Sequence, residues 1–78
     1  MRYTLKMPIQ SDTTREVFIT QWLVQVGEQV EVGDGLLTVE TDKAVVEVPS
    51  PFAGVLVEQL VAPEDEVEIG APFAVIEG

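Results

Sequence analysis

The residue best suited to chemistry in this sequence is a lysine near its middle. Lys43 stands in the polar run T-D-K-A at 41–44, between apolar runs at 36–40 and 45–48 that favour β-strands. A short polar break between two such runs is typical of an antiparallel hairpin. We therefore expect Lys43 at a hairpin tip, with its ammonium group in solvent.

This position suits covalent modification better than catalysis. An exposed lysine has a pKa of about 10.4, so at neutral pH it is protonated and is not a nucleophile by itself. A modifying enzyme can supply an activated acid and a base, provided that the turn is well defined and accessible. Asp42 favours a local turn, and the small Ala44 leaves room for an approaching enzyme. The sequence thus favours Lys43 as an attachment point, whereas Lys6 lies in a predicted strand.

Composition narrows the remaining functions. The 78 residues predict one small domain, 1–78, with neither histidine nor cysteine, which argues against autonomous catalysis and against a thiolate or imidazole metal site. Fourteen acidic residues against four basic ones give a net charge of −10 and disfavour nucleic acid and anionic membranes as partners. The sequence shows no long apolar run and no basic-then-apolar leader, so we expect a protein that neither spans a membrane nor is secreted.

Short apolar alternations predict an all-β domain of about eight strands, because no stretch carries a helical period. Between Ile19 and Trp22 the apolar spacing changes from two to three, which predicts a bulge or bend. The predicted strands are 3–7, 17–26, 29–32, 36–40, 45–48, 54–61, 66–69 and 73–77.

The two halves of the chain repeat each other. Shifting the sequence by 37 positions (67 minus 30) aligns the turns and strands of the first half with those of the second. The apolar residues then fall on the same alternating positions of each strand. Two like halves would pack with approximate two-fold symmetry as a small sandwich or flattened barrel. We then expect the lysine turn at one end of the domain and the chain end at the other. The matched pairs include Leu23 with Leu60, Val30 with Val67, Gly33 with Gly70, Leu36 with Phe73 and Val39 with Ile76.

Two motifs, E-T-D-K-A at 40–44 and V-P-S-P-F-A-G-V-L at 48–56, closely resemble the lipoyl domains of 2-oxo acid dehydrogenase complexes. The resemblance implies the biotinyl/lipoyl carrier fold, a flattened barrel or sandwich of two four-stranded antiparallel sheets with pseudo-two-fold symmetry. It further implies that lipoic acid is carried in amide linkage on Lys43. Such a domain does no bond chemistry itself and is part of a dihydrolipoamide acyltransferase.

The resemblance also implies partners. They are a lipoate-attaching enzyme, a thiamine diphosphate-dependent decarboxylating component, an acyltransferase core and the flavoprotein dihydrolipoamide dehydrogenase. The lysyl-lipoyl arm would swing between their active sites, where a high effective concentration replaces free diffusion. The expected location is the bacterial cytoplasm or the mitochondrial matrix.

One loop departs from the family. Similar domains usually have a loop near G-E-G-x-x-E-G between the first two strands, whereas this chain has S-D-T-T-R-E-V at 11–17 and keeps only Glu16. Since that loop is implicated in partner recognition, we expect Glu16 to act in recognition together with Asp42 and Ala44.

Three alternatives stay open. A biotin carrier domain of a carboxylase has a similar fold, but methionines typically flank its lysine. A glycine-cleavage lipoyl carrier is usually longer and adds helical segments. A non-catalytic interaction module would keep the fold and leave Lys43 unmodified.

Overall fold

The computed structural model describes residues 1–8, 15–41 and 44–78. All the regular secondary structure in these described residues is β-strand, with no helix among them, which confirms the all-β prediction. The strands are β1 (Arg2–Lys6), β2 (Glu16–Trp22), β3 (Gln29–Val30), β4 (Gly35–Glu40), β5 (Val45–Pro49), β6 (Gly54–Gln59), β7 (Glu66–Glu68) and β8 (Pro72–Glu77).

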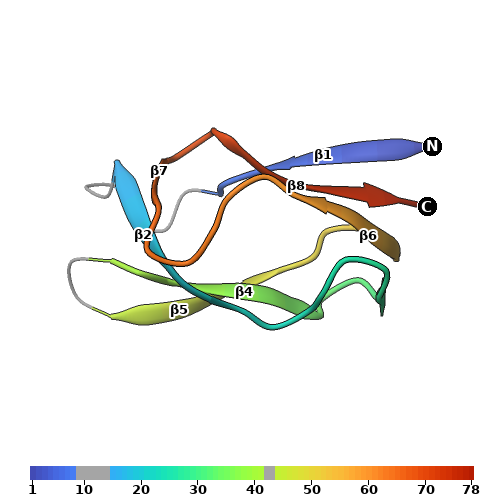
Figure 1. Cartoon of the computed structure of the whole chain (residues 1–78), viewed down its shortest axis with the longest axis horizontal. Helices are drawn as coiled ribbons and strands as arrows, with labels where there is room; N and C mark the ends of the chain where they lie inside the picture. Colours follow the sequence, from blue (N-terminus) through green and yellow to red (C-terminus); the bar gives the residue numbers. More distant parts are fainter. Residues whose placement is uncertain (9–14, 42–43) are drawn as a thin grey trace.

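The strands form two four-stranded antiparallel sheets that face each other (Figure 1). One sheet has the order β1-β8-β6-β3 and the other β5-β4-β2-β7. Exchanging β1 with β5, β2 with β6, β3 with β7 and β4 with β8 turns the first order into the second. The predicted pseudo-two-fold is therefore present, and each sheet takes two strands from each half of the chain.

The repeat extends to individual positions. Val30 and Val67, like Val39 and Ile76, are buried in both halves. Gly33 and Gly70 have φ of 92° and 90°, a left-handed conformation that favours glycine, so both turns need that residue. The halves of the sequence match because they occupy equivalent places in the fold.

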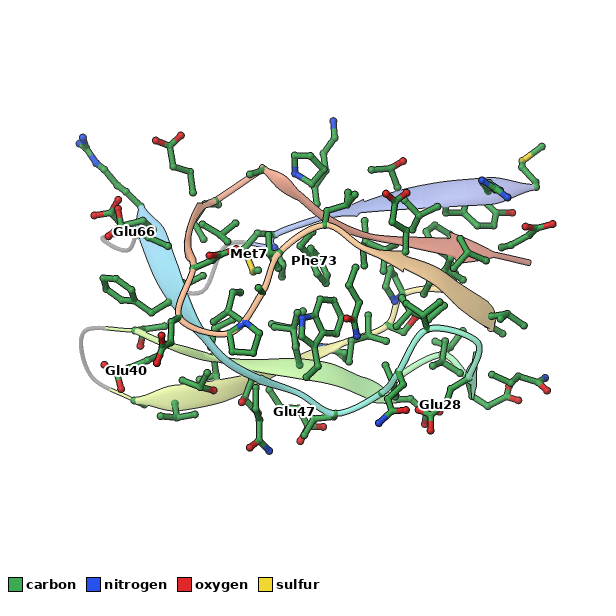
Figure 2. The ribbon with its side chains drawn as sticks, in the orientation of Figure 1. Met7, Glu28, Glu40, Glu47, Glu66 and Phe73 are labelled. Carbon is green, nitrogen blue, oxygen red and sulfur yellow. The ribbon has the colours of Figure 1, made fainter. Side chains whose placement is uncertain are left out.

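The core lies between the sheets, and its large side chains come from both of them. Met7 and Phe73 point into this space in Figure 2, and both are 1% exposed. The other core residues are Leu5, Val17, Ile19, Val30, Leu36, Leu37, Val39, Val48, Leu56, Val67, Ala74 and Ile76.

Several predicted strands run past the observed strand ends. The runs 3–7, 54–61 and 66–69 end one or two residues earlier than expected, at Lys6, Gln59 and Glu68, and two further runs are too long for an identifiable reason. The run 17–26 is a strand only to Trp22, because the chain then crosses to the other sheet, where the Gly27 N–H donates to the Leu56 carbonyl at 2.7 Å. The run 29–32 is a strand only to Val30, because the Asp34 carboxylate accepts from the Glu31 N–H and begins the turn. The expected irregularity in β2 is confirmed as a register shift between Ile19 and Gln21.

The end of β4 and the start of β5 lie at one end of the molecule, and the chain termini lie at the other (Figure 1). The N-terminal ammonium donates to the Gly78 carbonyl at 2.9 Å, which holds the two termini together. Glu40, where β4 ends, lies at the other end of the long axis in Figure 2. A partner can thus approach the hairpin without meeting the chain termini.

We predict that Val30→Asp unfolds the domain. Val30 is 1% exposed, and an unpaired charge in that position costs about 3–5 kcal/mol, a large part of the about 5–15 kcal/mol that stabilises a typical domain. Thermal melting followed by circular dichroism measures the loss. Val32→Asp is the matched control, because Val32 is 68% exposed and should melt as the parent does. Equal melting of the two variants would contradict the inward orientation of Val30.

Candidate functional site

The candidate site is the turn between β4 and β5. Its central residues, Asp42 and Lys43, lie outside the described residues, so their predicted roles stay predictions. The residues on either side are described. The Thr41 N–H donates to the Ala44 carbonyl at 2.8 Å, and the Thr41 hydroxyl donates to the same oxygen at 2.9 Å. The Ala44 N–H lies 3.3 Å from the Thr41 hydroxyl oxygen, which accepts from it.

These bonds close the hairpin directly behind residues 42 and 43. Thr41 and Ala44 therefore form a defined base, and Ala44 is exposed, as its predicted recognition role requires. Sequence reasoning missed the contribution of Thr41, although a hydroxyl residue at the start of a tight turn is a known signal for side-chain bonding to the backbone.

Strands β4 and β5 hold this base in place. The ladder pairs Glu40 with Val45 and Val39 with Val46, without irregularity up to the turn. Strand β4 also pairs with β2 on its other side, and Val39 is fully buried. The strands thus give Thr41 and Ala44 a stiff support, and a modifying enzyme needs its target beside such a support.

Glu16 comes close to this turn, although it lies far from it in the sequence. Glu16, Phe18, Glu40 and Thr41 line one cavity of about 240 Å³. The register explains the meeting, because Phe18 on β2 lies opposite Glu40 on β4. The structure thus brings the predicted recognition residue Glu16 to the base of the hairpin, and it adds Phe18, which is 47% exposed and which sequence reasoning did not single out.

The surface beside the turn is acidic. Glu40 and Glu66 lie opposite Phe18 from its two neighbouring strands, and Glu16 lies opposite Glu68. The pKa of the Glu16 carboxyl is raised above its ordinary value, first because it shares a hydrogen bond with the Glu66 carboxyl and then because the two groups have the same charge. A partner that approaches along this face meets negative charge with an aromatic ring at its centre.

No group of three or more acidic residues in the described ranges could hold a metal ion. The described chain also has no helix long and apolar enough to cross a membrane.

Comparison with known proteins agrees with this geometry. The family model described as biotin-requiring enzyme, the biotin/lipoyl family, matches residues 3–76. Over 76 residues the chain is 43% identical to the dihydrolipoyllysine-residue acetyltransferase component of the pyruvate dehydrogenase complex from Corynebacterium glutamicum. That match covers 97% of this chain but only 11% of the relative's length.

Two solved structures have the same fold. The lipoyl domain of the 2-oxoglutarate dehydrogenase complex from Azotobacter vinelandii superposes with a TM-score of 0.76 at 25% identity, covering 96% of this chain and 95% of that one. Urea carboxylase from Kluyveromyces lactis superposes with a TM-score of 0.84 at 26% identity, covering 99% of this chain and 6% of that one.

We predict that Glu16→Gln stabilises the domain at neutral pH and has little effect in acid. Because the pKa of Glu16 is higher in the folded state, the folded chain binds the proton more tightly, and stability falls as the pH rises from the unfolded pKa through the folded one. The variant lacks this loss, so its melting temperature should exceed that of the parent at pH 7 and approach it near pH 4. Glu58→Gln removes one charge from an exposed site elsewhere and reports the general effect of net charge. An equal response of both variants at both pH values would contradict the Glu16–Glu66 interaction.

We predict that Thr41→Val destabilises the domain by about 1 kcal/mol, because the shape is kept and the side-chain bonds to Ala44 are lost. Urea denaturation measures the change. Thr4→Val serves as the control, since the exposed Thr4 hydroxyl makes no hydrogen bond with a described residue. A Thr41 variant as stable as this control would show that the hydroxyl does not support the turn.

Proposed function

Since the chain belongs to the biotin/lipoyl family of carrier domains, we propose that it is a lipoyl carrier with its lipoyl group in amide linkage on Lys43. The observation that carries the proposal is the hairpin base, because the bonds between Thr41 and Ala44 close the ladder and leave only residues 42 and 43 between them. A modifying enzyme could therefore reach the Lys43 amine without opening a strand pair.

The chain's own residues would position the lysine and leave the bond chemistry to partners. The attaching enzyme must remove a proton from the Lys43 ammonium and supply an activated lipoyl group, whose carboxyl carbon then forms the amide bond. The attached dithiolane supplies the redox and acyl-carrying chemistry. The domain's part is to fix the residues on either side of the turn through the β4–β5 ladder and to offer a recognisable surface beside it.

The acidic face beside the turn supports a role in recognition. We propose that Glu16, Asp42 and Ala44 are read by the attaching enzyme and by the components that act on the arm. Glu16 lies against the same cavity as Thr41, directly at the hairpin base. Carboxylates placed around a docking point steer a partner with basic residues and increase its rate of association.

We further propose that the chain is a non-catalytic module of a dihydrolipoamide acyltransferase. The 43% identity to the acetyltransferase component from Corynebacterium glutamicum supports this, as does the structural match to a lipoyl domain of nearly the same length. Its partners would be the decarboxylating component, the acyltransferase core and dihydrolipoamide dehydrogenase. The domain would work where such complexes work, in the bacterial cytoplasm or the mitochondrial matrix.

A biotin carrier is the second candidate, favoured by the high TM-score to urea carboxylase. The flanking residues oppose it. Asp42 and Ala44 stand beside Lys43 where biotin carriers typically have methionines. Sequence identity is also higher to the acetyltransferase component than to urea carboxylase, at 43% against 26%.

We predict that Lys43→Gln stays folded and is not lipoylated, because the change removes the amine without altering the strands. The measurement is intact mass after coexpression with a lipoate-attaching enzyme and a biotin-attaching enzyme, each with its cofactor. The parent should gain one lipoyl group and Lys6→Gln should gain the same, whereas Lys43→Gln should gain nothing. A biotin increment on the parent would overturn the lipoyl assignment, and lipoylation of Lys43→Gln would move the site elsewhere.

A further inference from the structure

A second candidate site lies between the edges of the two sheets. Strands β1 and β5 are edge strands, and each pairs with a single strand among the described residues. A groove of about 480 Å³ lies between them, within the about 300–1,000 Å³ range of ligand pockets. Strand β1 contributes Thr4, Leu5 and Lys6, the segment 48–52 forms the opposite wall, and Pro8 and Phe73 complete the lining.

The groove has an apolar floor. Leu5, Val48 and Phe73 line it and are at most 3% exposed, so they are fixed by the core. Tyr3 and Phe52 stack with their ring centroids 4.2 Å apart, which ties the start of β1 to the opposite wall. The groove is therefore a preformed feature whose shape depends on packed residues.

The backbone of β1 offers hydrogen-bonding groups to this groove. Met1 and Gly78 exchange both of their backbone bonds, and in an antiparallel pair such residues alternate with residues whose N–H and C=O point away from the partner. Counting along β1 from Met1, the backbone N–H and C=O groups of Thr4 and Lys6 point away from β8. Met7 confirms this alternation, because its backbone groups point the opposite way. Its N–H donates to the Ala71 carbonyl, and its carbonyl accepts from the Gly70 N–H.

Residues 49–52 of the opposite wall offer no comparable donors, and Val48 is 1% exposed. Pro49 and Pro51 have no backbone N–H. The Ser50 N–H donates to the Asp34 carbonyl at 2.7 Å, and the Phe52 N–H donates to the Ser50 hydroxyl oxygen at 3.3 Å. A peptide lying in the groove can therefore form a ladder of backbone hydrogen bonds with β1 only.

Among its described lining residues, the groove has one charged side chain, that of Lys6. Lys6 lines the groove, is exposed and forms no ion pair with a described residue, whereas Arg2, at the far end of β1, is paired with Glu77 at 3.2 Å. In a chain with a net charge of −10, an unpaired ammonium here favours a local carboxylate on the ligand and disfavours a local cation.

We propose that this groove binds an extended peptide segment of a partner protein, which adds as a strand to β1. Its inward side chains are apolar and lie over Leu5, Val48 and Phe73, and an outward carboxylate lies beside Lys6. The segment has few other acidic residues, because the domain as a whole repels anions. Main-chain bonds to an edge strand give affinity, and side chains of alternating direction give selectivity. This site is independent of the lipoyl proposal, since it lies on β1 and needs no modification of Lys43.

The direct test is an NMR titration of the isotope-labelled domain with a capped seven-residue peptide. The probe alternates valine and threonine and carries glutamate at its central outward position. The N–H signals of Thr4 and Lys6 should shift and become protected from hydrogen exchange, while those of Tyr3 and Leu5, already bonded to β8, should change less. No change at Thr4 and Lys6, or changes confined to the β3 and β7 edges, would overturn the proposal.

Variants separate the backbone bonds from the charge. Thr4→Pro removes one outward N–H without touching the β8 ladder, so the domain should fold and bind the peptide about tenfold more weakly. Thr4→Val keeps the N–H and should bind as the parent does. Lys6→Glu should weaken binding of the glutamate peptide by roughly two- to five-fold and favour a probe with lysine in its place.

Three results would contradict the proposal. Unchanged binding by a folded Thr4→Pro would exclude strand addition. A Lys6→Glu variant that keeps the original preference would exclude the charge contact and remains informative if Thr4→Pro fails to fold. Shifts of Thr4 and Lys6 that appear on raising the protein concentration without peptide would show that the occupant is a second copy of the chain.

Discussion

The structure depends on the burial of one face of each sheet against the other. A chain of this length buries only about 60–65% of the surface exposed on unfolding, so few residues can form the core and each must come from a correctly phased strand. Leu36 and Phe73, equivalent in the two halves, are 0% and 1% exposed at its centre. A shift of one residue in either strand would turn these side chains outward, so the phase of the strands fixes every exposed position as well.

Irregularities in the pairing register change which residues of a strand face the core. Leu36 and Leu37 are both buried although they are neighbours, because the register between β4 and β5 shifts between Gly35 and Leu37. Phe73 and Ala74 are buried in the same way, next to the shift at Leu5/Lys6 between β1 and β8. The two shifts occupy equivalent places, so the duplicated halves share an irregularity as well as a pattern.

This arrangement separates support from recognition. The β4 strand is held on both sides, which keeps the base of the hairpin stiff, while the outward residues of β2 and β4 contribute Glu16, Phe18 and Glu40 to the surface beside it. Between the edge strands β1 and β5 lies an apolar groove, along which β1 offers backbone hydrogen-bonding groups. The acidic face comes from β2 and β4, whereas the groove is lined by β1 and the segment 48–52 over a floor of core residues.

The sequence alone determined the strand content and the duplication, because a period of two and the glycines at 33 and 70 are local signals. It also indicated the family through the motif around Lys43. Only the tertiary structure decided that Trp22 ends β2, that β3 stops at Val30, and that Glu16 and Phe18 meet Glu40 and Thr41, because these depend on where the chain crosses between sheets. The free N–H groups of Thr4 and Lys6 follow from β1 lying at a sheet edge, and the order of strands in a sheet is set by long-range packing that no local pattern records.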